Sequence, residues 1–152
     1  MDKVRDVVNG LKKSYAMELE SVQNYLANSI HLEGDRADEV KEVLEQAVAS
    51  ELRHARWLAG RIKILDGCVP GSLELPRDQN YLQPPLNNRE SATVIRGALT
   101  ATDAAIAHYQ ATIQITEGLD YVTQDLLIEL LAEEQERRDL LNQLLARISS
   151  GP

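Results

Sequence analysis

A glutamate and a histidine, Glu51 and His54, interrupt an apolar pattern in the second long segment of the chain. Residues three apart share one face of a helix. The other positions on this face are apolar: Val40, Leu44, Ala47, Leu58, Ile62 and Leu65. A buried carboxylate and a buried imidazole each need a partner, and a metal ion held by both is one solution. The spacing alone is a weak signal, because a solvated helix edge shows it too.

Two further segments place a carboxylate in the middle of an apolar stripe. Glu18 interrupts the first stripe, and Glu134, followed one turn later by Arg137, interrupts the last. The apolar members of the first stripe are Val4, Val8, Leu11, Tyr15, Val22 and Tyr25, and those of the last are Leu127, Leu130, Leu141, Leu144 and Ile148. Mid-helix positions of a bundle lie at similar heights. We therefore expect a metal site formed by Glu18, Glu51, His54 and Glu134.

The segments that carry these residues have the lengths of long helices. The periodicity predicts helices over residues 3–31, 36–65, 88–118 and 121–148, with Asp35 and Asn88 as N-caps. Residues 66–89 hold four of the five prolines and are predicted to be a long connection. Two short turns and one long crossover predict an all-α, four-helix bundle. Residues 1–152 are expected to form a single domain with its crossover at about 66–89.

Composition narrows the class of function. The chain has 152 residues and a net charge of −8, which argues against nucleic acid as a partner. The single cysteine, Cys68, forms no internal disulfide, and no uncharged run approaches the length of a membrane span. We expect a cytoplasmic protein without a membrane partner. The absence of Phe favours helices packed through aliphatic side chains.

The sequence resembles the ferritin-like superfamily, and most closely the bacterioferritins. The matching residues run over nearly the whole chain: Glu18-Leu19 and Asn24-Tyr25, Glu51-x-x-His54, Asp120-Tyr121-Val122, and the segment 128–134 that ends in Glu133-Glu134. The resemblance implies that Glu18, Glu51, His54 and Glu134 are di-iron ligands, with Glu51 and Glu134 bridging. It also implies oxidation of Fe(II) by dioxygen or peroxide, often inside a hollow shell that stores iron.

The sequence departs from the family pattern at two ligand positions. Ala101, or Thr102 in a register shifted by one, stands where the family has a glutamate on the third helix. Arg137 stands where it has a histidine, and a guanidinium has no lone pair for a metal. We hypothesise that Arg137 replaces a second metal ion electrostatically through ion pairs with Glu134 and Glu51. Asp103 is expected to point elsewhere, and His108 to be a hydrogen-bonded core residue.

Two functions therefore remain open. The first is an iron-binding protein with one or two ions and a weakened ferroxidase-type centre, active in iron storage or detoxification. The second is a non-catalytic scaffold or partner subunit, which binds no metal and whose Glu/His/Arg cluster is closed by ion pairs. Leu52 stands where haem-binding bacterioferritins have methionine, so no haem is expected. A homo-oligomer is expected, either a dimer or a cage. No counterpart of the fifth short helix of 24-subunit shells follows Ile148, so a cage is expected to have 12 subunits.

The remaining polar residues have structural interpretations. Tyrosines on the apolar stripes, such as Tyr25 and Tyr109, are expected to hydrogen-bond buried carboxylates or backbone, although Tyr25 could instead be a redox-active neighbour of the metal. Glu20 is expected to face solvent. The run 133–139 is expected to be a solvated face apart from Glu134 and Arg137.

Overall fold

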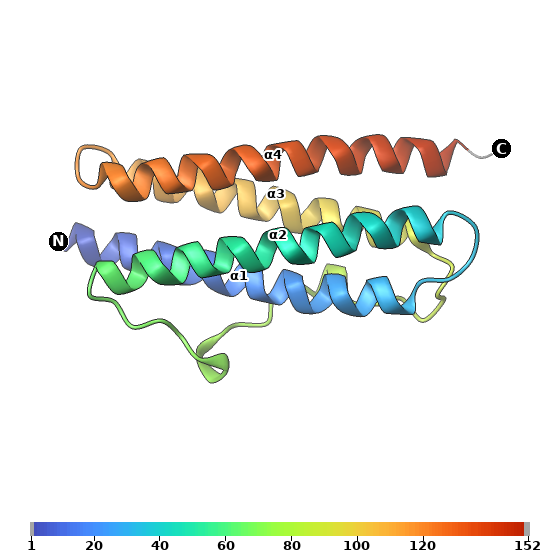
Figure 1. Cartoon of the computed structure of the whole chain (residues 1–152), viewed down its shortest axis with the longest axis horizontal. Coiled ribbons are helices and arrows are strands. Elements are labelled where there is room, and N and C mark those ends of the chain that lie inside the picture. Colours follow the sequence, from blue (N-terminus) through green and yellow to red (C-terminus); the bar gives the residue numbers. More distant parts are fainter. Residues whose placement is uncertain (1, 151–152) are drawn as a thin grey trace.

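Four long helices form the molecule, and a computed structural model describes them over residues 2–150. They are α1 (Lys3–His31), α2 (Ala37–Ile64), α3 (Ser91–Thr116) and α4 (Tyr121–Ser149). The four lie side by side along one long axis (Figure 1). Short turns join α1 to α2 and α3 to α4, and no strand occurs among the described residues. The prediction of an all-α, four-helix bundle is confirmed.

Asp side chains begin two of the helices. Asp2 accepts a hydrogen bond of 3.1 Å from the backbone N–H of Arg5 at the start of α1. Asp120 accepts one of 3.0 Å from the N–H of Thr123 at the start of α4. A carboxylate at this position satisfies an otherwise free N–H group and interacts favourably with the helix dipole.

The two predicted N-caps, Asp35 and Asn88, are wrong. Arg36 precedes α2 in the left-handed conformation, with φ 70°, so Asp35 belongs to the turn that begins at Gly34. Glu90 precedes α3, and the turn before it contains Asn88. The Asn88 carbonyl accepts a 2.8 Å hydrogen bond from the N–H of Glu33, which ties the end of the crossover to the α1–α2 turn.

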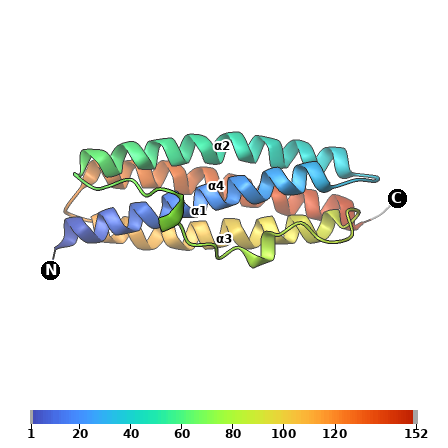
Figure 2. The ribbon, with the colours of Figure 1, turned by 90° about the horizontal axis from the view of Figure 1, so that it is seen from below.

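The connection between α2 and α3 crosses the length of the bundle. It contains two single-turn 3₁₀ helices, η1 (Ser72–Glu74) and η2 (Asn80–Leu82), and its second half follows the face formed by α1 and α3 (Figure 2). Glu20 anchors it to α1 by accepting hydrogen bonds of 3.0 and 3.1 Å from the N–H groups of Asp78 and Gln79. The expectation that Glu20 simply faces solvent is therefore wrong.

Two apolar clusters fill the bundle, one toward each end. One is built around Leu44, Ile95 and Leu141, and the other around Leu11, Leu58 and Leu127. Each buried side chain of this size stabilises the fold by roughly 1.5–3 kcal/mol. Val4, expected in the first stripe, is 45% exposed because it lies beyond the end of the second cluster. Polar residues at mid-length are thus enclosed by apolar layers on both sides.

Among the described residues, no helix is both long and apolar enough to cross a membrane.

Candidate metal centre

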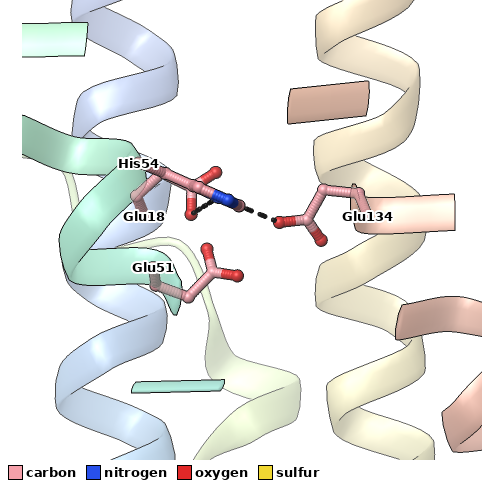
Figure 3. A group of neighbouring side chains, drawn as sticks. All are labelled: Glu18, Glu51, His54 and Glu134. Atoms are coloured by element: carbon pink, nitrogen blue, oxygen red, sulfur yellow. Dashed lines mark ion pairs between the residues drawn. The ribbon is translucent and has the colours of Figure 1, made fainter. Parts of the chain in front are cut away.

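Glu18, Glu51, His54 and Glu134 converge in the middle of the bundle. Glu18 comes from α1, Glu51 and His54 from α2, and Glu134 from α4 (Figure 3). One potential ligand atom from each residue lies within 4.8 Å of the others. All four side chains are buried, with exposed fractions between 0 and 3%. The structure thus brings together all four residues that the sequence pattern selects.

His54 presents an unprotonated nitrogen to this cluster. Its Nε2 lies 2.6 Å from Glu133 Oε2, so Nε2 carries the proton and donates it to that carboxylate. Its Nδ1 lies 3.5 Å from Glu18 Oε2 and 3.8 Å from Glu134 Oε1, beyond hydrogen-bond distance. Burial lowers the pKa of His54 from its ordinary value, which favours the neutral ring. A lone pair therefore faces two carboxyl groups.

Glu133 is a functional residue that the sequence interpretation placed in solvent. It is partly buried between His54 and Arg53, whose Nη2 donates to Glu133 Oε2 at 2.8 Å. Burial raises the pKa of Glu133, but the hydrogen bond from His54 and the charge of Arg53 outweigh it and lower the pKa overall. Trp57 completes this group by stacking on His54, with ring centroids 6.3 Å apart, beneath Arg53.

The sequence could have pointed to Glu133 only through the hydrogen-bonding requirement of His54. It precedes Glu134 and lies about 100° around α4, at the edge of the inward face. A metal-binding histidine usually donates its second N–H to a carboxylate or carbonyl. That requirement signals that an acceptor oxygen must lie near His54, but it does not identify which residue supplies it.

Tyr109 holds one oxygen of Glu18. Its hydroxyl donates to Glu18 Oε1, which confirms the expectation that a tyrosine on the stripe binds a buried carboxylate. Glu18 Oε2 has no hydrogen-bond partner within residues 2–150 and points toward His54. Burial raises the pKa of Tyr109 well above its ordinary value, so the hydroxyl keeps its proton as a donor.

Arg137 enters the cluster from α4. Its Nη1 forms an ion pair with Glu51 Oε1 and lies 3.6 Å from Glu134 Oε1. Its side chain is only 10% exposed. Burial lowers the pKa of Arg137, and the neighbouring Tyr25 hydroxyl opposes that shift. The geometry supports the ion pair with Glu51 that the sequence hypothesis proposed for Arg137, and it places the guanidinium close to Glu134.

The Glu134 carboxyl and the Tyr25 phenol, both near Arg137, are neutral in the metal-free chain. Burial, with a smaller contribution from the charge of Glu133, raises the pKa of Glu134 to about 8. Burial also raises the pKa of Tyr25 to about 12, although the charge of Arg137 opposes the shift. At neutral pH Glu134 therefore holds a proton that a cation would have to displace.

The third helix supplies no ligand to the cluster. Ala101 and Thr102 line a cavity of about 10 Å³ beside Glu18, Glu51 and Glu134, close to the smallest volume that holds one water molecule. Asp103 lies at the surface near Arg138, at 3.4 Å. His108 Nε2 donates to the Gly10 carbonyl at 2.8 Å. The expectation for Asp103 is confirmed, and His108 forms the expected hydrogen bond but is only partly buried.

The donor set suits a hard or borderline cation. Glu18 Oε2, His54 Nδ1 and Glu134 Oε1 are buried and have no hydrogen-bond partner within the described chain. A buried polar atom without a partner costs about 1–3 kcal/mol, and three such acceptors aimed at one point repel one another. Carboxylate oxygens with one imidazole nitrogen are ligands typical of Fe(II) and Mn(II). The residues present therefore fit one bound metal ion.

Comparison with known proteins decides the family. A model of the family described as "Ferritin: Ferritin-like domain" matches residues 8–150. The chain belongs to the ferritin-like family. The resemblance noted in the sequence is thereby confirmed.

The relatives of this ferritin-like chain differ in what their names state. A "DNA protection during starvation protein" from Pyrococcus furiosus is 27% identical over 97% of this chain and 81% of its own length. A dodecameric thioferritin, the bacterioferritin-related protein of Bacteroides fragilis, is 25% identical with a TM-score of 0.84, over 97% of this chain and 88% of that one. A ferritin-like, diiron-carboxylate protein of Bacillus anthracis has a TM-score of 0.83 at 20% identity, over 95% and 99%, and supports the fold alone.

Proposed function

We propose that this ferritin-like protein binds iron at Glu18, Glu51, His54 and Glu134 and acts in iron storage or detoxification. The observation that carries the proposal is the convergence of four buried ligand atoms within 4.8 Å of one another. The match of residues 8–150 to the ferritin-like family and the carboxylate and imidazole donors support iron over other cations. Bound Fe(II) would supply the electron that reduces dioxygen or peroxide in a ferroxidase reaction, with oxidation of the iron to Fe(III).

The chain's own residues prepare this site in three ways. Glu133 accepts a hydrogen bond from the Nε2–H of His54 and so keeps Nδ1 free as a ligand. Tyr109 fixes Glu18 through one oxygen and leaves the other for the cation. The apolar layers above and below exclude water, which strengthens every electrostatic contact within the site.

A second candidate function follows from Arg137. Because its guanidinium already pairs with Glu51, the cluster could instead be a closed structural ion-pair group in a scaffold or partner subunit. This alternative predicts that metal ions leave the stability of the protein unchanged. It also predicts that removal of one charge destabilises the fold whether or not metal is present.

The two candidates separate in one experiment on the metal-free protein. Thermal unfolding is measured with and without Fe(II) under anaerobic conditions, and with Mn(II), for the wild type, Glu51→Ala and the exposed control Glu45→Ala. Iron binding predicts that metal raises the Tm of the wild type and of the control but not of Glu51→Ala. A metal-independent Tm in the wild type, with a lower Tm in Glu51→Ala, would instead favour the scaffold.

We further propose a homo-oligomer in the cytoplasm. The dodecameric state of the Bacteroides fragilis relative supports the homo-oligomer. The exposed free thiol of Cys68 suits a reducing compartment and so supports the cytoplasm. The net charge of −8 argues against DNA binding by this chain. Haem is not included, because Leu52 has no atom that could ligate it. Light scattering on the purified protein tests the assembly, and a monomer at micromolar concentration would contradict it.

A further inference from the structure

The charge of the cluster depends on Arg137. Once bound as ligands, Glu18, Glu51 and Glu134 are ionised, while His54 is neutral. The Arg137 guanidinium, paired with Glu51, brings the total to two negative charges. One divalent cation neutralises that charge, whereas two would leave two positive charges in a buried, low-dielectric site. Uncompensated charge of this size is strongly unfavourable.

The positions of the donors agree with this charge balance. His54 Nδ1 lies 3.5 Å from Glu18 Oε2 and 3.8 Å from Glu134 Oε1, and none of these three acceptors has a hydrogen-bond partner within the described chain. The fourth acceptor, the carboxylate oxygen Glu51 Oε1, is paired with Arg137, whose Nη1 also lies 3.6 Å from Glu134 Oε1. On α3, the adjoining positions are Ala101, Ala105 and Thr102, whose hydroxyl donates to the Ala98 carbonyl at 2.8 Å, so this helix offers no carboxylate or imidazole. The site thus has donors for one ion, and its second half is already occupied by a cation.

We propose that Arg137 is the residue that sets the metal stoichiometry of this protein. Its guanidinium acts as a resident cation beside Glu51 and Glu134 and restricts the site to one divalent metal ion per chain. This inference rests on the proposed iron-binding function and deepens it. It distinguishes the chain from a diiron-carboxylate protein, because the second positive charge is covalently part of α4.

The test counts Mn(II) ions, which do not oxidise in air, by equilibrium dialysis and elemental analysis. The decisive variant is Arg137→His, which removes the resident charge and adds an imidazole donor facing Glu51 and Glu134. Arg137→Lys keeps the charge. Arg138→His makes the identical substitution at the next residue, whose side chain is 42% exposed and paired with Asp103 rather than with the cluster.

The wild type, Arg137→Lys and Arg138→His are expected to bind one Mn(II) per chain, and Arg137→His two. Two ions in the wild type, or one in a folded Arg137→His protein, would overturn the role of Arg137 while leaving iron binding in place. No ion in any variant would overturn both proposals. No ion in the wild type with binding in Arg137→His would overturn the proposed function and still support Arg137 as the resident cation.

Folding of the variants is checked by circular dichroism, and Arg137→Gln provides a second readout if Arg137→His does not fold. Removal of the guanidinium ends the competition for Glu51 and the repulsion of the incoming cation. Mn(II) affinity in Arg137→Gln should therefore rise by about tenfold or more over the wild type. An unchanged or weaker affinity would contradict the proposal.

Discussion

At the scale of single residues, the centre is defined by where protons and lone pairs lie. His54 donates a hydrogen bond from its Nε2–H to Glu133 and directs the lone pair of its Nδ1 toward the cluster. Glu18 is held by Tyr109 through one oxygen only. These contacts leave acceptors aimed at one another, an arrangement that a proton or a metal ion must stabilise.

Glu133 should matter for metal affinity more than for the fold. In Glu133→Ala, His54 loses the acceptor that fixes its tautomer, so Mn(II) affinity should fall about 10–100-fold. Isothermal titration calorimetry measures the change. Glu136→Ala is the matched control, because Glu136 lines the same groove between α2 and α4 without contacting His54. Equal losses in both variants would show that general acidity, rather than the contact with His54, determines affinity.

Glu134 should make the metal-free protein less stable as pH rises. Its pKa is raised to about 8 by burial, so the folded state holds a proton that the unfolded chain releases above its ordinary value near 4.5. The stability associated with this group is complete below about pH 4.5 and is lost as pH rises through about 8. Urea unfolding of the wild type and Glu134→Gln between pH 5 and 8 measures the difference. A constant difference across that range would refute the raised pKa.

At the scale of elements, the helices place the site and the crossover is fastened beside it. Helix bounds follow from apolar periodicity within about three residues, because burial of one face dominates helix formation. The N-caps at Asp35 and Asn88 were wrongly predicted because each residue lies inside the turn before its helix. The Ala37 N–H and the Gly34 carbonyl close the first turn, and the Glu90 N–H and the Asn87 carbonyl close the second. The anchoring role of Glu20 was also hidden, since its partners are backbone N–H groups far along the chain.

Removal of the Glu20 carboxylate should loosen the crossover. Glu20→Ala deletes two hydrogen bonds to the N–H groups of Asp78 and Gln79, which should lower the free energy of unfolding by about 1–2 kcal/mol. Urea denaturation measures the loss, with Glu42→Ala on the exposed face of α2 as control. Hydrogen exchange at Asp78 and Gln79 should accelerate in Glu20→Ala. Unchanged exchange there would show that other contacts hold the crossover.

At the scale of the whole molecule, two apolar cores enclose one polar layer. Four stripe interruptions at mid-length were sufficient to predict that layer, because elements of similar length align their centres in an antiparallel bundle. Glu133 was not predicted, because its role depends on the approach of α4 to α2, which periodicity does not encode. The ion pair between Arg137 and Glu51 followed from placing both on inward faces.

The proposed function requires the mid-bundle cluster to bind iron. Crystals grown from metal-free protein and soaked anaerobically with Fe(II) test it through anomalous difference maps collected on both sides of the iron absorption edge. We expect a single iron peak bounded by Glu18 Oε2, His54 Nδ1 and Glu134 Oε1, with Arg137 still inside the bundle. Maps without an iron peak among these atoms would contradict it.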